Sequence, residues 1–308
     1  MQTYAPIALF TYNRADKTQR VVESLLQNAE AKYSDLFIFS DGSKSPEKKA
    51  GVKENRKYIH TISGFKSISI IEREKNWGLA NSLIAGITEV INKYGRVIVV
   101  EDDLILSPYF LKFMNDGLEK YKDDDRVGTI NAFVPPIKEK LPDTYFLYFM
   151  HPWGWATWKR SWDLLNLNTK YLLRKMRFKV KKFNLGGNCG SYGNLYCQKV
   201  GKVDSWYIRF YASLFLNKKL NLFPKQAMVI NGGLDDSGTH CGTGWAEKYS
   251  FESSHIPIIL KNIPVVESME AYGKFKRFYD NSCDSTSLVS KLERLKSFLR
   301  RLFYIDCM

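Results

Sequence analysis

Three adjacent carboxylates stand directly after a short apolar run. The run Val97–Val100 contains only valine and isoleucine, and Glu101, Asp102 and Asp103 follow it. Carboxylates this close together repel one another, which raises their pKa unless a cation compensates the charge. A hard divalent cation, which prefers oxygen ligands, would provide that compensation. The pattern predicts a metal site, and the alternative is a solvated turn that caps the following helix.

Two further polar residues follow apolar runs in the same way. Arg14 comes after the run 7–11 and could contact a phosphate or a base, with an ordinary surface arginine as the alternative. Asp41 ends the run 36–39. Ligands of open α/β sheets bind outside the carboxyl ends of the strands. Asp41 and the three acids are therefore expected to face one cleft.

Strand and helix patterns alternate over residues 1–133 and would position these side chains. Strands are expected at 7–11, 36–39, 67–71, 96–100 and 127–133, and helices from 16, over 47–62, over 78–94 and from 107. Asp16 is expected to cap the first helix. Strands separated by helices indicate an α/β protein with a mostly parallel sheet flanked by helices. After Pro135 and Pro136 the chain becomes rich in aromatic residues.

The composition fits a soluble protein of one large domain or two smaller ones. The chain has 308 residues, 44% hydrophobic and 25% charged, which argues against a disordered or fibrous protein. No apolar run approaches the ~18 residues of a membrane span, and residues 1–14 do not resemble a secretory signal. Five cysteines without a Cys-x-x-Cys pair favour reduced thiols in the cytoplasm. The lack of a P-loop or a G-x-G-x-x-G after the first strand disfavours ATPase and dinucleotide sites.

The net charge of +14 is concentrated in two segments. Residues 170–182 carry seven basic residues and no acid, and residues 288–303 carry five basic residues and one acid. In the second segment apolar residues recur at spacings of three and four, which is typical of a helix on an anionic membrane. Its alternative is a helix docked on the protein's own core. Clustered basic residues also suit nucleic acid, so a non-catalytic nucleic-acid-binding protein is an alternative function.

Four segments of the first half together resemble a GT-A glycosyltransferase. They are TYNRADKTQRVVESLL at 11–26, FSDGS at 39–43, NWGLANSL at 76–83 and VVEDDL at 99–104. The acidic segment is most similar to the animal N-acetylglucosaminyltransferase I type, and NWGLANSL to the broad family-2 bacterial enzymes. The resemblance implies a GT-A (Rossmann-like) fold and transfer of a sugar from a nucleotide diphosphate. UDP is favoured because the animal enzymes use it.

The resemblance also implies which residues bind the donor. Asp103 would hold Mn²⁺ or Mg²⁺. Asp41 and Arg14 would contact the uridine end, and Glu101 and Asp102 the ribose or the sugar. The remaining donor-binding residues that it implies are Asn76, Gly78 and Asn81.

Three segments of the second half resemble the acceptor side of the same family. HPWGWATW at 151–158 resembles the segment that contacts the acceptor and the donor sugar. VDSWYIR at 203–209 matches Asp204 to the catalytic base, which would take the proton of the acceptor hydroxyl in an inverting displacement. A helix N-cap is the alternative for Asp204. NGGLDDSGTH at 231–240 resembles the loop that covers the donor, with His240 as a metal ligand or, alternatively, a histidine held by the backbone.

Aromatic residues and the order of these segments complete the prediction. Trp155 and Trp206 are expected to stack on the acceptor sugar, with core packing as the alternative. Residues 1–135 would form the nucleotide-sugar-binding half and 136–284 the aromatic-rich acceptor-binding and catalytic half. Residues 285–308 would form a basic amphipathic C-terminal helix.

The sequence thus predicts a metal-dependent inverting hexosyltransferase. The acceptor would be lipid-linked or an oligosaccharide, in the synthesis of bacterial lipopolysaccharide, O-antigen or capsule. The protein would be cytoplasmic, peripheral on the membrane, and without a nucleic-acid partner. A sugar-1-phosphate nucleotidyltransferase is the alternative enzyme, but such enzymes normally begin with a glycine-rich loop that residues 11–14 lack. A glycoside hydrolase is disfavoured because its paired acids stand about 5–10 Å apart on separate elements.

Overall fold

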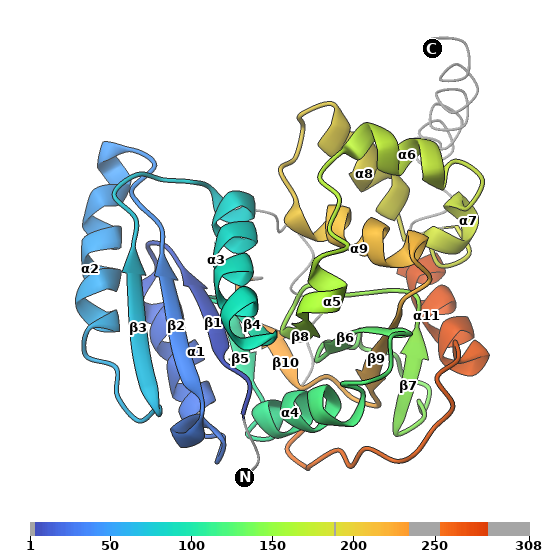
Figure 1. Cartoon of the computed structure of the whole chain (residues 1–308), viewed down its shortest axis with the longest axis horizontal. Helices are drawn as coiled ribbons and strands as arrows, with labels where there is room; N and C mark the ends of the chain where they lie inside the picture. The colour runs from blue at the N-terminus through green and yellow to red at the C-terminus, as the bar shows by residue number, and fades with distance from the viewer. Residues whose placement is uncertain (1–3, 188, 234–252, 283–308) are drawn as a thin grey trace.

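A computed structural model describes residues 4–187, 189–233 and 253–282, whose strands form an eight-stranded and a two-stranded sheet (Figure 1). The large sheet has the order β3-β2-β1-β4-β8-β6-β9-β7, and the small sheet pairs β10 with β5. The strands are β1 (Ile7–Thr11), β2 (Asp35–Ser40), β3 (Ser67–Glu72), β4 (Arg96–Glu101), β5 (Leu104–Leu106), β6 (Val127–Asn131), β7 (Thr144–Leu147), β8 (Trp155–Trp158), β9 (Leu220–Pro224) and β10 (Val229–Asn231). The helices are α1 (Ala15–Leu26), α2 (Lys49–Ile59), α3 (Leu79–Tyr94), α4 (Phe110–Lys120), α5 (Lys159–Trp162), α6 (Thr169–Met176), α7 (Val180–Phe183), α8 (Ser191–Lys199), α9 (Trp206–Leu216) and α11 (Met269–Ser282), with 3₁₀ turns η1 (Ala31–Tyr33) and η2 (Pro46–Lys48).

The first half of the large sheet follows the alternation of strand and helix patterns in the sequence. Strands β3, β2, β1 and β4 are parallel to one another, and helices connect them. All five residues of β1 are buried, which is why this strand is a continuous apolar run. The predicted α/β architecture with a mostly parallel sheet is confirmed.

The second half of the sheet departs from simple alternation. β8 runs antiparallel between β4 and β6, and β7 runs antiparallel beside β9. The strand predicted at 127–133 ends at Asn131. The segment 151–158 was expected to contact the acceptor, but its second part is β8, in the middle of the sheet. One sheet therefore continues from the first half of the chain into the second.

Helices cover both faces of the large sheet and bury a core on each. Residues of α3 and α9 belong to one apolar cluster, and residues of α1 and α4 to the other. A Cβ at Gly86 of α3 would come within 2.7 Å of the Phe10 ring and 3.0 Å of the Phe39 ring. Those two rings stack with centroids 5.0 Å apart. Glycine at this position lets α3 lie close to β1 and β2.

The predicted helix cap at Asp16 is wrong, and so is the alternative assignment of Asp204 as a helix cap. Helix α1 begins at Ala15, so Asp16 lies inside its first turn, where a negative charge is still favourable. Helix α9 begins at Trp206, and the hydroxyl of Ser205 accepts the N–H of Ile208. Ser205 is therefore the N-cap, and the carboxylate of Asp204 is not used to start the helix.

Helices α6, α7 and α8 gather over α9 at the upper right of Figure 1. α6 packs against both α8 and α9. Within the three described ranges, no helix combines the length and the apolar character needed to cross a membrane.

Candidate active site

The acidic residues lie at the carboxyl end of β4, beside the end of β1. Glu101 is the last residue of β4. Nη2 of Arg14 donates to Oδ1 of Asp102 at 2.5 Å and to Oδ2 of Asp103 at 3.0 Å. The N–H of Tyr12 also donates to Oδ2 of Asp102, at 3.4 Å. The structure thus brings Arg14, Asp102 and Asp103 together, as two carboxylates around one cationic group.

Arg14 alone does not balance the charge of this cluster. Burial, together with the charges of Asp103 and Asp102, raises the pKa of Glu101 to about 8, against the opposing effect of Arg14. Burial raises the pKa of Asp102 to about 6, against the opposing effect of Arg14. Burial would lower the pKa of Arg14, but the two aspartates outweigh burial and raise it. Raised carboxylate pKa values indicate a site that would be stabilised by further positive charge.

The chain that follows β10 lies against Asp103. The N–H of Gly232 donates to the backbone oxygen of Asp103 at 2.6 Å, and Nζ of Lys17 donates to the backbone oxygen of Gly232 at 2.5 Å. A Cβ at Gly233 would lie 2.6 Å from Oδ2 of Asp103. Any side chain at that position would displace the carboxylate. Glycine at position 233 therefore leaves room for the Asp103 carboxylate.

The acids suit a divalent cation that shares its coordination with a substrate. In the described part of the chain, no group of three or more His, Cys, Asp and Glu side chains could hold a metal ion. Oxygens of Asp102 and Asp103 nevertheless converge on one point, Nη2 of Arg14. Mg²⁺ is commonly bound by one or two carboxylates together with waters and substrate phosphates. The pair fits an ion held jointly with a diphosphate better than a site made of protein ligands alone.

Asp41 is buried, and backbone N–H groups donate hydrogen bonds to both oxygens of its carboxylate. Oδ1 accepts the N–H groups of Gly42 and Trp77, each at 2.9 Å, and Oδ2 accepts the N–H of Gly78 at 3.0 Å. Asp41 thereby joins the loop after β2 to the loop before α3. Asp41 and Arg14 were predicted to contact the same uridine, and in the structure they have separate partners.

The other predicted donor residues lie in the loop before α3 or, for Asn81, in the first turn of that helix. Nδ2 of Asn76 donates to the backbone oxygen of Gly42 at 2.8 Å, and Nδ2 of Asn81 donates to that of Trp77 at 3.0 Å. Gly78 has a φ of +77°, in the region that glycine adopts without strain. Hydrogen bonds and the positive φ of Gly78 therefore hold Asp41, Asn76, Gly78 and Asn81 in one region of the structure.

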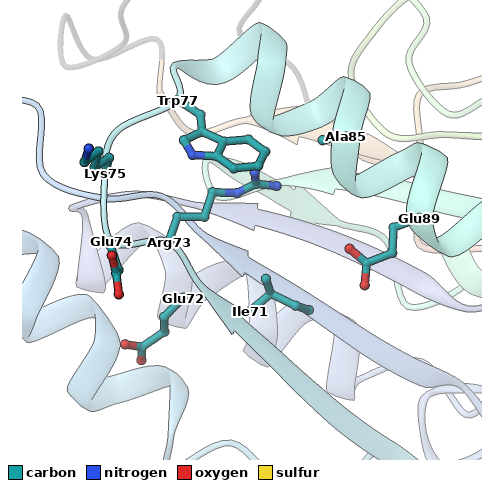
Figure 2. Close-up of a pocket in the computed structure, with 8 residues that line it drawn as sticks. All are labelled: Ile71, Glu72, Arg73, Glu74, Lys75, Trp77, Ala85 and Glu89. Carbon is teal, nitrogen blue, oxygen red and sulfur yellow. The ribbon is translucent and has the colours of Figure 1, made fainter.

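A buried arginine that was not predicted lies beside these loops. Arg73 follows β3 and is 7% exposed, and its guanidinium carbon is 3.6 Å from the centre of a Trp77 ring (Figure 2). Its Nε has no hydrogen-bond partner in the described part of the chain. Burial lowers the pKa of Arg73, while Asp41 and Glu89 raise it. Its position directly after a strand, like that of Asp41, is the signal that could have revealed it.

Arg73 lines a hollow of about 420 Å³ at the end of β3. Figure 2 shows its guanidinium beside the indole of Trp77, with Glu89 projecting from α3. A second hollow, of about 290 Å³, lies between α6 and α9. The acids after β4 line neither hollow. Charge and hydrogen bonding therefore locate the site more directly than surface shape does.

The predicted acceptor role of Trp155 and Trp206 is wrong. Trp155 is completely buried and Trp206 is 3% exposed. Their rings stack with centroids 5.2 Å apart, and Trp155 also contacts Trp162 and Phe210. A sugar cannot stack on a ring that protein atoms cover. Both tryptophans pack the core between β8 and α9.

Asp204 is more accessible than these tryptophans. Its side chain is 58% exposed, and its Oδ1 accepts a hydrogen bond from Nη2 of Arg209 at 3.0 Å. Arg209 is 9% exposed, and its Nε donates to the backbone oxygen of Ser205 at 3.0 Å. A buried arginine held in this way orients the exposed carboxylate.

Pairing of the strands relates Asp204 to the acids. Trp206, two residues after Asp204, stacks on Trp155. Trp155 begins β8 and pairs with Val99, two residues before Glu101 on β4. Asp204 therefore belongs to the same edge of the sheet as the acidic cluster.

Three aromatic rings lie together beside this edge: Phe133 follows β6, and His151 and Trp153 belong to the predicted segment 151–158. The ring of His151 lies 4.1 Å from that of Phe133 and 4.8 Å from that of Trp153, between centroids. The N–H of His151 donates to Oδ1 of Asn131 at 3.1 Å. Burial lowers the pKa of His151 to about 3. His151 and Trp153 are partly exposed, whereas Trp155 is completely buried.

Some predictions concern residues outside the described ranges. They are His240, the loop beyond Gly233 that would cover the donor, and the C-terminal helix at 285–308.

Comparison with known sequences gives the family. The sequence model described as "Glycosyl transferase family 2" matches residues 7–192. The curated α-1,3-mannosyl-glycoprotein 2-β-N-acetylglucosaminyltransferase of Arabidopsis thaliana is 25% identical over 179 residues. That alignment covers 53% of this chain and 39% of the plant enzyme, so the chain spans well under half of that relative.

Three solved structures are similar at low scores. A mannosyltransferase of Pyrobaculum calidifontis in complex with GDP-mannose and Mn²⁺ is 10% identical with a TM-score of 0.37, over 70% of both chains. TarS of S. aureus is 14% identical with a TM-score of 0.35, over 52% of this chain and 29% of TarS. A UDP-glucose pyrophosphorylase bound to UDP-glucose is 12% identical with a TM-score of 0.40, over 74% of this chain and 94% of that one.

The family match includes the strands of the donor half and the acids after β4. It covers more than half of the chain, whereas the structural scores are too low to assign a substrate. The predicted resemblance to the glycosyltransferase family and the predicted α/β architecture are confirmed. The chain belongs to glycosyl transferase family 2.

Proposed function

We propose that the protein transfers a sugar from a nucleoside diphosphate, UDP in our preferred case, to a hydroxyl of a glycan, with a divalent cation and inversion at the anomeric carbon. The observation that carries this proposal is the convergence of Asp102 and Asp103 on one point at the end of β4. A single cationic side chain occupies that point. A divalent cation would supply the positive charge that these carboxylates need, and its remaining coordination positions would bind the diphosphate.

The donor side of the reaction would use residues of the first half of the sheet. Asp103, with Asp102 beside it, would hold Mn²⁺ or Mg²⁺, and such an ion neutralises charge that develops on a leaving diphosphate. Arg14 would exchange one of its carboxylate partners for a phosphate oxygen, a ligand suited to its planar guanidinium. Asp41, Arg73 and the loop before α3 would shape the place of the nucleoside.

The acceptor side would use Asp204 as the base. Its carboxylate would accept the proton of the acceptor hydroxyl while the oxygen forms a bond to the anomeric carbon. The bond from that carbon to the diphosphate oxygen would break in the same step, and the electron pair would leave with the diphosphate. Exposure of the Asp204 carboxylate and its fixed contact with Arg209 support this assignment.

The wider setting is also a proposal. The acceptor would be lipid-linked or an oligosaccharide of a bacterial surface polysaccharide, such as lipopolysaccharide, O-antigen or capsule. Residues 1–135 would bind the donor and 136–284 the acceptor, and the basic helix at 285–308 would contact the cytoplasmic face of the membrane. His240 would add a metal ligand, since it follows Gly233 by seven residues and Gly233 lies beside Asp103.

Binding of UDP with and without Mn²⁺ tests the proposal, using Asp103→Asn and, as a matched control, Asp163→Asn. Asp163 is an exposed residue that pairs with Lys159. Calorimetry should show Mn²⁺-dependent UDP binding in the wild type and in Asp163→Asn, and loss of the Mn²⁺-dependent part in Asp103→Asn. Equal binding by all three proteins would remove Asp103 from the metal site.

Product analysis separates the proposed transfer from the alternative nucleotidyl transfer. A glycosyltransferase releases a nucleoside diphosphate from its donor, whereas a nucleotidyltransferase releases pyrophosphate as it makes a nucleotide sugar. Pyrophosphate formed from UTP and a sugar 1-phosphate would overturn the proposal.

A further inference from the structure

Helices α6 and α7 and the turn between them carry an exposed cationic surface with an aromatic residue at the turn. We propose that this surface, the α6–α7 tip, binds an anionic lipid membrane. Its exposed residues are Lys170, Tyr171, Arg174, Lys175, Arg177, Phe178, Lys179, Lys181 and Lys182.

The fold holds the cations on the outside of the molecule. Five apolar residues of the same segment are buried: Leu172, Leu173, Met176, Val180 and Phe183. α6 packs on α8 and α9, and Phe183 of α7 stacks on Tyr211 of α9. Because the apolar side of both helices packs against the protein, their basic residues face solvent.

The charge of the tip is mostly uncompensated. Lys182 pairs with Glu267 at 3.0 Å, and no other cation of the tip has a carboxylate partner in the described ranges. Burial lowers the pKa of Lys199 on α8, and Lys170 lowers it further, as expected where ammonium groups crowd. Anionic lipid headgroups would relieve this repulsion, because the negative potential of such a membrane attracts basic residues near its surface.

Phe178 favours a membrane over a nucleic acid as the partner. It is 84% exposed at the turn between the helices. The guanidinium carbon of Arg177 lies 4.3 Å from the centre of its ring, so a cation covers one face of the ring. A projecting apolar ring flanked by cations is typical of residues that enter the interfacial layer of a bilayer.

A hollow of about 290 Å³ beside the tip fits a lipid phosphate. It is lined by Leu164, Asn166, Tyr171, Leu172, Lys175, Lys179, Ser213, Leu216 and Asn217. The lining has two ammonium groups, two amides and two hydroxyls, and it has no carboxylate. This is the chemistry of a site for an anionic headgroup.

The hollow lies beside the helix that follows Asp204, so a membrane bound at the tip would bring a lipid-linked acceptor towards the proposed base. This step rests on the proposed function. The hollow reaches the last turn of α9, whereas Asp204 precedes the first turn of the same helix. The eleven residues of α9 span roughly 16 Å. A lipid-linked acceptor seated at the tip would need to extend only a few sugar units to reach Asp204.

Sedimentation with vesicles tests the proposal on the full chain. Phosphatidylcholine vesicles with phosphatidylglycerol should bind the wild type, and vesicles of phosphatidylcholine alone should bind it weakly. The triple variant Lys175→Gln/Arg177→Gln/Lys179→Gln should bind the anionic vesicles about tenfold or more weakly. Phe178→Ser should also bind the vesicles more weakly than the wild type. The difference should be larger at high salt, where the apolar contact contributes a larger share of the binding.

A matched triple variant on α2, Lys49→Gln/Lys53→Gln/Lys57→Gln, removes the same charge from exposed residues at the far left of Figure 1. It should bind vesicles like the wild type. Equal binding by both triple variants, or no binding by the wild type, would overturn the proposal. Binding to RNA without binding to anionic vesicles would assign the tip to nucleic acid instead. Mn²⁺-dependent UDP binding, measured on the same proteins, tests the proposed function separately because the tip is remote from the acids.

Discussion

The two halves of the large sheet hold their polar side chains in different ways. In the donor half the polar groups are bonded within the strand ends: Arg14 joins Asp102 and Asp103, and Asp41 joins two loops. In the second half, aromatic side chains pack over the strand ends. The polar candidate Asp204 lies outside this packing, on the exposed loop before α9. Polar groups are thus bonded to one another at the strand ends of the first half, whereas the polar candidate of the second half lies outside the core.

Strand direction explains much of the difference. The strands of the donor half are parallel, so the residues that follow them meet at one edge. β8 is antiparallel and begins at that edge, with Trp155. A residue at the start of β8 is therefore placed at the functional edge and yet is covered by α9. Whether a residue precedes or follows a strand therefore indicates its edge of the sheet only when the direction of that strand is known.

The largest expected effect concerns Asp204 alone. Asp204→Asn should lower kcat by about 100- to 10,000-fold, because the amide cannot accept the proton of the acceptor hydroxyl. Binding of UDP with Mn²⁺ should stay unchanged, since Asp204 lies outside the donor half. Steady-state kinetics and calorimetry on the same preparation measure both, with Asp163→Asn as the control. A normal kcat would show that the acceptor half keeps its base elsewhere.

The packing of the acceptor half is tested by stability. Trp155→Ala should lower the free energy of unfolding by about 3–5 kcal/mol, because it empties a fully buried site. Trp77→Ala should cost about 0.5–1 kcal/mol, since Trp77 is 48% exposed and mainly loses its contact with Arg73. Urea unfolding followed by circular dichroism gives both values. Similar losses for the two variants would contradict the contrast between buried and exposed tryptophans.

A smaller effect should appear in the pH dependence of stability. The pKa of His151 is about 3 in the folded chain, below its ordinary value of 6.5. Its neutral form is therefore favoured by folding, and that stability is present above pH 6.5 and is lost as the pH falls towards 3. At pH 5 the loss is up to about 2 kcal/mol. Urea unfolding from pH 7 to pH 4 measures it.

Two variants separate His151 from the other groups that titrate in this range. His151→Phe should show a weaker decline in stability between pH 7 and pH 5 than the wild type. His60→Phe removes an exposed histidine on α2 and should follow the wild type. If His60→Phe and His151→Phe decline alike, burial of His151 does not set the pH dependence.

Local sequence patterns were sufficient to predict the first half of the sheet. Apolar runs followed by polar residues predicted β1, β2 and β4 and the polar residues at their ends, since a buried parallel strand must be apolar and must stop where the chain reaches solvent. Arg73 follows β3 in the same way and was overlooked because its neighbours Glu72 and Glu74 make the end of that strand look like an ordinary charged loop.

In the acceptor half, residue type did not reveal burial. Trp153 and Trp155 are two residues apart, and one is partly exposed while the other is in the core. An aromatic ring suits both a sugar and a protein interior. The choice depends on whether another element covers the ring, and for Trp155 that element is α9, about fifty residues later in the chain.

The sequence by itself therefore determined the α/β architecture, the family resemblance and the acidic cluster after β4, because these depend on short apolar and polar patterns. Only the tertiary structure decided that Arg14 lies between Asp102 and Asp103, that Ser205 rather than Asp204 caps α9, and that Trp155 is covered. It also showed that the basic residues of α6 and α7 share one outer surface. These facts depend on contacts between segments distant in the chain, which pairing and packing of the elements create and local patterns do not encode.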